Sequence, residues 1–180
     1  MYRAGQRLLE ITDGDFELYI RDGYRLMEAQ RMDWNEGMEV LLREIGNEDR
    51  ALAAALTLYS DPRGFDENDP RTWTLNTPIH ATGGAVDTFI LSRRNPRISD
   101  WIIIHDYPDR IAHYETDYFE KKNRLTPAEE MVRNNRRILL GVMASEGFTN
   151  YPREPWHFDY GDQMWGLLTD RTAIYGYAKL

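Results

Sequence analysis

The stretch Pro78–Asp87 reads PIHATGGAVD and joins a glycine-containing turn to the start of an apolar segment. His80 lies in the turn, and Asp87 lies just inside a predicted strand at 86–91 (VDTFIL). Because side chains alternate along a strand, Asp87 shares a face with Phe89. A carboxylate on an apolar face is costly unless it is paired or binds a cation. The Gly-Gly pair would let the chain fold back, so that His80 and Asp87 converge.

A second polar pair lies near the end of the chain, in Glu154-Pro155-Trp156-His157. Pro155 disfavours helical geometry at Glu154, so this segment is predicted to be extended or a turn. A glutamate three residues before a histidine is typical of hydrolytic zinc sites, in which one residue is the base and the other a ligand.

A third motif, Asp22-Gly23-Tyr24-Arg25, follows the apolar run Phe16–Ile20. That run predicts a strand that ends near the Asp-Gly pair. Arg25 would then lie just past a strand-ending turn. Its planar, permanent charge is suited to stabilising an oxyanion.

Each motif alone also fits an ordinary structural role. His80 could be a solvated turn histidine, with Asp87 hydrogen-bonded to backbone. The glutamate and histidine of the second motif could make surface hydrogen bonds beside a core Trp156. Arg25 could form a surface ion pair.

The rest of the chain predicts an α+β fold, a single domain over residues 1–180 with a small antiparallel sheet flanked by helices. Thr126 and Glu129 form a capping box at the start of a helix that runs to about Glu146, and Gly147 is suited to its end. Further helices are expected at 26–45 and 51–58, further strands or β-like pieces at 101–104, 156–160 and 164–168, and a long loop at 60–78.

Composition excludes several classes of protein. The 180 residues are 42% hydrophobic, which is enough for a core, and the net charge of −8 argues against a non-specific nucleic-acid binder. No apolar run approaches the roughly 20 residues of a membrane-spanning helix. Without cysteine there can be no disulfide, thiolate ligand or cysteine nucleophile. No secretory signal is evident, so we expect a cytoplasmic protein, or a periplasmic one if a signal was removed. The oligomeric state is not indicated.

Together and in this order, the three motifs resemble those of the D-alanyl-D-alanine dipeptidases. These are the VanX-type zinc metallopeptidases of the wider D,D-peptidase and hedgehog-like fold group. The motifs read DGYR at 22–25, H-x-x-G-x-A-x-D at 80–87 and E-x-W-H at 154–157. The segment 136–148, RRILLGVMASEGF, is also similar to the helix before the family's last motif. The resemblance runs from about residue 18 to residue 165.

The resemblance implies a D,D-peptidase-like fold and a role for each motif residue. His80, Asp87 and His157 would bind one Zn²⁺, which leaves the fourth position for water. Glu154 would be the general base and then the acid, and Arg25 would polarise the scissile carbonyl. Two neutral imidazoles and one carboxylate leave such a site near +1, which lowers the pKa of bound water from about 15.7 toward 7.

The substrate implied by the resemblance is a small D-amino-acid peptide. Asp106, in DWIIIHDY at 100–107, falls where the family has an aspartate that receives the substrate's ammonium group. Two departures lie beside the expected pocket. Pro78 stands where the family usually has serine, and Pro155 where it commonly has tryptophan. Both bear on dipeptide specificity more than on the metal site.

Two further histidines, His105 and His113, flank a turn and could form a rival metal cluster with Asp106 or Asp109. Solvent-exposed or outer-shell roles fit them better, because their spacing matches no common zinc motif.

Three functions remain open at this point. The first is a zinc dipeptidase for D-Ala-D-Ala, and the second a carboxypeptidase or endopeptidase for longer peptidoglycan peptides. The third is a non-catalytic module that binds metal or peptide. Glu154 and Arg25 argue against the third, because a structural zinc site is normally closed by four protein ligands and needs no base.

Overall fold

The structure is a computed structural model that describes residues 1–180 except 95–101, 105–106, 109–111 and 180. The chain divides into two compact units. We call Met1–Asp22 with Val86–Tyr160 the sheet unit, and Gly23–Ala85 with Gly161–Leu180 the helical unit. The single domain expected from the sequence stays a prediction.

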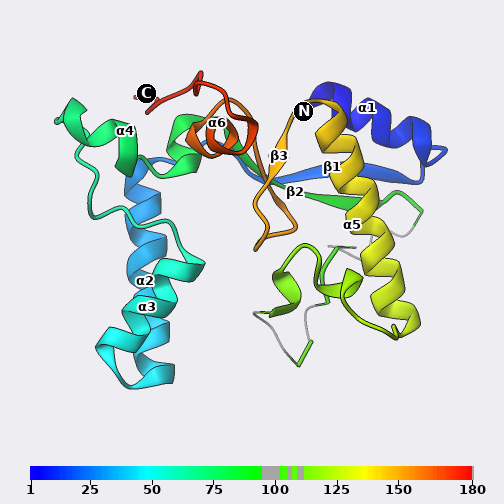
Figure 1. Cartoon of the computed structure of the whole chain (residues 1–180), viewed down its shortest axis with the longest axis horizontal. Coiled ribbons are helices and arrows are strands. Elements are labelled where there is room, and N and C mark those ends of the chain that lie inside the picture. The colour runs from blue at the N-terminus through cyan, green and yellow to red at the C-terminus, as the bar shows by residue number, and fades with distance from the viewer. Residues whose placement is uncertain (95–101, 105–106, 109–111, 180) are drawn as a thin grey trace. The chain divides into compact units, whose positions relative to one another are not determined.

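The sheet unit contains a four-stranded sheet with the order β1-β2-β4-β3 (Figure 1). The strands are β1 (Phe16–Asp22), β2 (Ala85–Ser92), β3 (Thr149–Asn150) and β4 (His157–Asp159). β1 and β2 pair antiparallel, with Phe16 opposite Ser92 and Asp22 opposite Asp87, and β3 and β4 also pair antiparallel. Together with the helices, this sheet confirms the predicted α+β class.

Helix α5 (Pro127–Ser145) is the longest helix described in this unit, and α1 (Tyr2–Ile11) packs against it. The predicted capping box begins α5: the Glu129 backbone N–H donates to Thr126 Oγ1, and the Thr126 N–H donates to a Glu129 carboxylate oxygen at 2.7 Å. Two short 3₁₀ helices, η3 (Ala112–Tyr114) and η4 (Tyr118–Glu120), precede it. The predicted helix is therefore confirmed.

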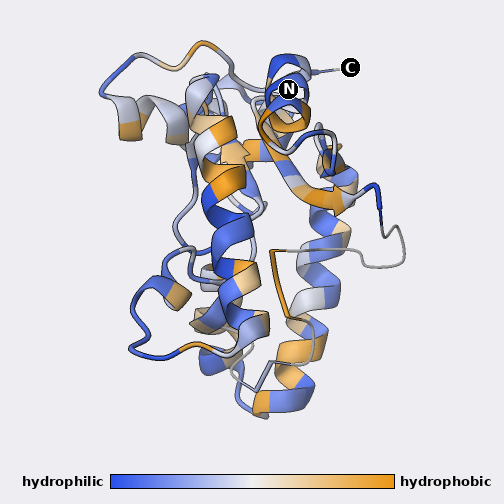
Figure 2. Ribbon diagram, turned by 90° about the vertical axis from the view of Figure 1, so that its right-hand side faces the viewer, coloured by the Kyte–Doolittle hydropathy of each residue, from blue (hydrophilic) through white to orange (hydrophobic). Residues whose placement is uncertain are grey.

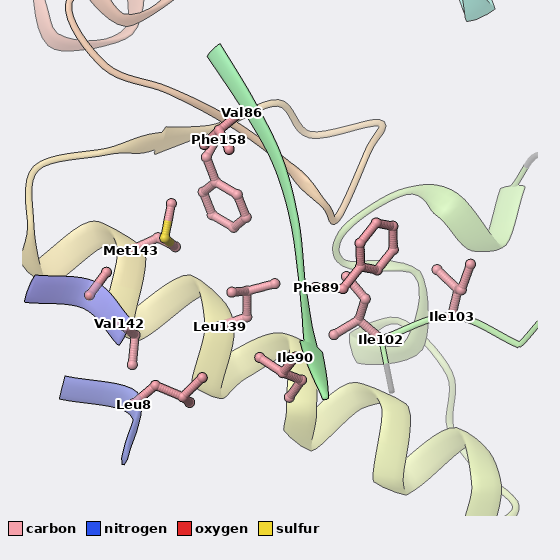
Figure 3. Packing of buried hydrophobic residues seen from close by; sticks show 11 residues of the cluster. Leu8, Val86, Phe89, Ile90, Ile102, Ile103, Leu139, Val142, Met143 and Phe158 are labelled. Atoms are coloured by element: carbon pink, nitrogen blue, oxygen red, sulfur yellow. The ribbon is translucent and has the colours of Figure 1, made fainter. Parts of the chain in front are cut away.

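The core of the sheet unit lies between β2 and the helices α1 and α5. Figure 3 shows β2 crossing α5, with Leu8, Ile90 and Leu139 among the side chains gathered between them. Phe89 and Ile90 are both fully buried although they are neighbours in β2. β2 has a strand on each side, and both of its faces are covered at this point.

The helical unit is built around α2 (Met27–Ile45) and α3 (Glu48–Leu58), which pack together. α2 ends at Ile45, as predicted, and Gly46 follows it with a φ of 68°, in the left-handed region. The predicted loop 60–78 contains the short helices η1 (Pro70–Thr72) and α4 (Trp73–Asn76). Figure 2 shows that the helices mix hydrophilic and hydrophobic residues.

The last part of the helical unit consists of η2 (Ile79–Thr82), α6 (Gln163–Thr169) and the C-terminal tail. Tyr177 of the tail packs its ring against Phe65 and Trp73, at centroid distances of 4.7 and 5.2 Å. The Ala178 backbone N–H donates to the Ala81 carbonyl. The tail, which carries no recognisable motif, thus contributes to the small core beside η2.

Two segments predicted as β-structure are not strands. Residues 102–104 form a turn and irregular backbone, although Ile102 is fully buried. Residues 164–168 lie inside α6, because the Asp162 carboxylate accepts a hydrogen bond from the Trp165 backbone N–H and caps a helix there. Both errors arise because a short apolar run does not distinguish a strand from other buried segments.

Within the part of the chain that the structure describes, no helix has both the length and the apolar character needed to cross a membrane.

Candidate metal centre

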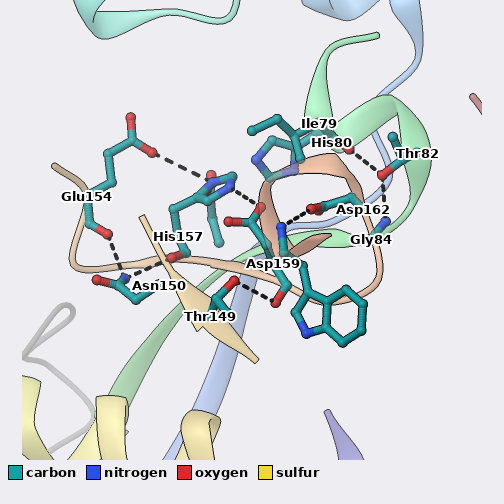
Figure 4. Close-up of polar contacts among 12 residues, drawn as sticks. Ile79, His80, Thr82, Gly84, Thr149, Asn150, Glu154, His157, Asp159 and Asp162 are labelled. Carbon is teal, nitrogen blue, oxygen red and sulfur yellow. Dashed lines mark hydrogen bonds and ion pairs between the residues drawn. The ribbon is translucent and has the colours of Figure 1, made fainter. Parts of the chain in front are cut away.

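The imidazole of His157, at the start of β4, lies at the centre of a polar cluster in the sheet unit. Its Nδ1 lies 3.0 Å from Asp87 Oδ1 and 3.7 Å from Glu154 Oε2. Its Nε2 lies 2.9 Å from Asp159 Oδ1. Figure 4 shows the imidazole with Glu154 on one side and Asp159 on the other. Three residues predicted from two separate motifs thus meet, and Asp159 joins them.

The turn between β3 and β4 is held in shape by hydrogen bonds to its backbone. The amide of Asn150 donates to the carbonyls of both Glu154 and His157, at 3.0 and 2.8 Å. The Asn150 side-chain oxygen in turn accepts from Thr116 Oγ1. The Glu154 N–H donates to the Tyr151 carbonyl. This segment is therefore a turn, as predicted, and its backbone orients Glu154 and His157 together.

The position of Asp87 follows from the strand order. β2 neighbours β4 in the sheet, and the Thr88 N–H donates to the Trp156 carbonyl at 2.9 Å. The Trp156 ring stacks on Phe89 and meets Tyr114 edge-on. Trp156 is thus packed against the core, and Asp87, one residue before Thr88, lies beside His157.

The cluster is largely shielded from water and attracts positive charge. The side chain of His157 is 6% exposed, that of Asp87 13% and that of Glu154 28%, while Asp159 is fully buried. Burial lowers the pKa of His157, but hydrogen bonds to Asp159 and Asp87 outweigh it and raise the pKa to about 10. The carboxylates therefore favour a cation at this position, either a proton on the imidazole or a metal ion.

The helical unit brings His80 together with the DGYR motif. His80 lies in η2, and its Nδ1 is 2.8 Å from the Gly23 carbonyl oxygen. The Arg25 backbone N–H donates to the His80 carbonyl at 3.1 Å. η2 ends at Gly83, whose φ of 73° lies in the left-handed region that glycine adopts readily. When Nδ1 donates to the Gly23 carbonyl, the lone pair of the imidazole is on Nε2, the atom suited to a metal.

The Arg25 guanidinium is held by two neighbours in α2. Its Nη1 donates to Gln30 Oε1 at 2.9 Å and lies 3.2 Å from Asp33 Oδ2. Gln30 is itself fixed, because its amide donates to the Ser60 carbonyl. The side chain of Arg25 is 21% exposed. The Arg25 side chain is therefore more buried and more firmly held than an arginine in an ordinary surface ion pair.

Of the remaining predicted residues, Asp106, His105 and Asp109 lie outside the described residues. His113 is fully buried and packs between the rings of Tyr107 and Tyr114. It belongs to no group of three potential ligands within the described ranges. The rival cluster of His105 and His113 with Asp106 or Asp109 stays a prediction, because three of these four residues lie outside the described residues.

Two residues of the cluster, Asp159 and Asn150, were not predicted. The alternation of β4 could have indicated Asp159, because residues two apart in a strand share a face. No sequence pattern indicates Asn150, whose contacts depend on how the turn closes.

Comparison with known proteins agrees with the motifs. Residues 114–175 match the family described as D-ala-D-ala dipeptidase. A D-alanyl-D-alanine dipeptidase from Synechocystis sp. is 30% identical over 97 residues, which cover 53% of this chain. The match covers 39% of that relative, so the chain spans about two fifths of its length.

One solved structure was also compared, a mutant of the vancomycin resistance D,D-pentapeptidase VanY in complex with Zn(II). It is 21% identical, with a TM-score of 0.40, over 87% of this chain and 68% of the other. The similarity to the dipeptidase family rests on the sequence matches. Residues 114–175, which carry Glu154, His157 and Asp159, match the D-Ala-D-Ala dipeptidase family model, and the predicted resemblance to this family is confirmed.

Proposed function

We propose that this protein is a zinc metallopeptidase that hydrolyses D-alanyl-D-alanine or a closely related short D-amino-acid peptide. In this proposal His80, Asp87 and His157 hold one Zn²⁺. The observation that carries this proposal is that Asp87 and Glu154 both lie beside the imidazole of His157. His157 Nδ1 is 3.0 Å from Asp87 Oδ1.

The donor atoms fit zinc. Imidazole nitrogen and carboxylate oxygen are both common zinc ligands, and ligand atoms about 2.0–2.1 Å from the ion in a tetrahedral site lie about 3.3 Å from each other. The Asp87 oxygen and the His157 nitrogen are separated by nearly that distance, 3.0 Å. Three protein ligands, rather than four, are typical of catalytic zinc.

The remaining residues would carry out the proton transfers and charge stabilisation. Zinc lowers the pKa of water, which provides a nucleophile near neutral pH. Glu154, whose carboxylate is 3.7 Å from the His157 ring and partly exposed, would accept the proton of the attacking water and return it to the leaving amine. Arg25 would stabilise negative charge on the carbonyl oxygen. Asp106 would bind the substrate's ammonium group.

The first experiment measures D-alanine release from D-Ala-D-Ala by the purified protein with added Zn²⁺. The control is the same reaction after a chelator and dialysis, with activity restored by Zn²⁺. Chelator-sensitive release supports the proposal. If the protein binds zinc but releases no D-alanine, the dipeptidase assignment is wrong.

One observation favours a second candidate, a peptidase for longer peptidoglycan peptides. An open hollow of about 460 Å³ lies beside the turn that carries Glu154. It is lined by Glu115, Thr116, Asp117, Lys121, Asn150, Pro152 and Arg153. Such a hollow provides room for residues beyond a dipeptide. Cleavage of a stem pentapeptide without cleavage of D-Ala-D-Ala would support this candidate instead.

A further inference from the structure

We propose that Asp159 is a positioning residue that fixes the imidazole of His157 so that Nδ1, and not Nε2, faces the metal. This inference rests on the proposed function, because it assumes that His157 binds zinc. It assigns a role to a residue outside the three sequence motifs.

The geometry gives the two ring nitrogens different partners. Asp159 Oδ1 is 2.9 Å from Nε2, on the side of the ring away from Asp87 and Glu154. Nδ1 faces the carboxylates proposed as ligand and base. A carboxylate accepts but does not donate a hydrogen bond, so Asp159 requires a proton on Nε2. That proton leaves the lone pair of neutral imidazole on Nδ1.

The placement of Asp159 follows from the hairpin. His157 and Asp159 are two residues apart in β4, so their side chains share a face of the strand. Asp159 also pairs with Thr149 of β3, which holds its backbone in the sheet. The same strand therefore presents the Asp159 carboxylate and the His157 imidazole, and this fixes their positions relative to one another.

Burying the Asp159 carboxylate costs free energy unless a nearby cation offsets its charge. Asp159 is fully buried, and its Oδ2 has no hydrogen-bond partner among the described residues. Its only described side-chain hydrogen bond is the one to His157. A buried carboxylate needs a nearby cation to offset the loss of water. An imidazole bound to zinc supplies that positive charge. In return, the hydrogen bond from the imidazole to Asp159 makes the imidazole a stronger metal ligand.

The test compares Asp159→Asn with the wild-type protein. Asparagine has the same shape but no charge, and its amide can donate to Nε2 and so favour the tautomer with a proton on Nδ1. The matched control is Asp13→Asn, which removes the same charge from an exposed side chain of the sheet unit. His157→Ala identifies the zinc that depends on this ligand.

The first readout is the dissociation constant of Zn²⁺ alone, measured by competition with a chromophoric chelator. We expect Asp159→Asn to weaken zinc binding about 10–100-fold, in the range observed for outer-shell partners of metal-binding histidines. Asp13→Asn should bind zinc as the wild-type does. Unchanged affinity in Asp159→Asn, with affinity lost in His157→Ala, would overturn the inference and leave the proposed zinc site standing. If wild-type protein binds no zinc, both are wrong.

The second readout separates positioning from a general structural role. Urea unfolding with and without Zn²⁺ measures how much the metal stabilises each variant. Positioning predicts a smaller zinc-dependent shift in Asp159→Asn, with little change in the metal-free midpoint. An equal loss with and without zinc would mean that Asp159 only supports the fold. ¹⁵N NMR of the zinc-loaded wild-type protein should find the proton of His157 on Nε2, and a proton on Nδ1 would contradict the inference.

Discussion

The carboxylate of Asp87 and the imidazole of His157 lie 3.0 Å apart although 70 positions separate them in the chain. The neighbouring strands β2 and β4 bring the two together. Glu154 joins them through the turn that Asn150 holds closed. The proposed base and two of the proposed metal ligands are thus placed by regular hydrogen bonding of one sheet and one hairpin.

Replacement of Glu154 by glutamine should separate catalysis from metal binding. The amide cannot accept the proton of the attacking water, so we expect kcat to fall by about 10²–10⁴-fold or more. Zinc content, measured by atomic absorption, should stay near the wild-type value. Glu130→Gln, on the exposed face of α5, is the control and should keep its activity. Full activity in Glu154→Gln would show that another group is the base.

Replacement of Arg25 by lysine should lower turnover without loss of zinc. Lysine keeps the charge but cannot reproduce the planar group that contacts Gln30 and Asp33. Loss of one oxyanion donor typically costs about 10²–10³-fold in kcat. The comparison is Arg71→Lys, whose side chain is 90% exposed. If the two variants have equal kcat values, Arg25 does not act on the substrate.

Glu129→Gln should remove part of the acid sensitivity of folding. Hydrogen bonds from Lys122, the Thr126 N–H and Tyr107 lower the pKa of Glu129 from 4.5 to about 2. Because the folded-state pKa is below the unfolded one, this carboxylate stabilises the fold above about pH 4.5 and loses that effect as the pH falls toward 2.

The measurement is the free energy of unfolding in urea between pH 7 and pH 2.5, with chelator present. The difference between wild-type protein and Glu129→Gln should be constant at high pH and shrink below about pH 4.5. The exposed Glu130→Gln serves again as the control. A difference that does not change with pH would contradict the assigned pKa.

Arg136→Met should strongly destabilise the sheet unit. Burial lowers the pKa of this guanidinium to about 10, and it donates to the carbonyls of Ile102, His113 and Glu115. Methionine would leave those carbonyls without this donor, which costs on the order of 3 kcal/mol in the free energy of unfolding. Arg137→Met, one position along α5 and 55% exposed, should cost less than about 1 kcal/mol in the same urea titration. Equal losses would show that the buried contacts contribute little.

Local signals in the sequence were sufficient for several parts of the structure. The Thr126–Glu129 box begins α5 as predicted, because both partners lie within one turn of the chain. Gly46 ends α2 because it adopts the left-handed backbone conformation, which depends only on local geometry. Glu154 and His157 were found from their spacing, since a short turn brings such residues together.

Other features depended on tertiary structure. The apolar runs at 101–104 and 164–168 resemble strands. In the first, Ile102 and Ile103 are buried without being in a strand, and residue 101 lies outside the described residues. The second is capped as a helix by Asp162. Asn150 holds the Glu154 turn through contacts that exist only once the hairpin has closed.

The sequence by itself therefore determined the α+β class, the main helices and the residue types of the proposed zinc site. Only the tertiary structure decided which groups surround the His157 ring. Asp159 is the clearest case: its spacing from His157 allows a shared face, but its complete burial and its contact with Nε2 depend on packing in the sheet. Spacing governs neighbours along one element, whereas burial and charge pairing are properties of the assembled fold.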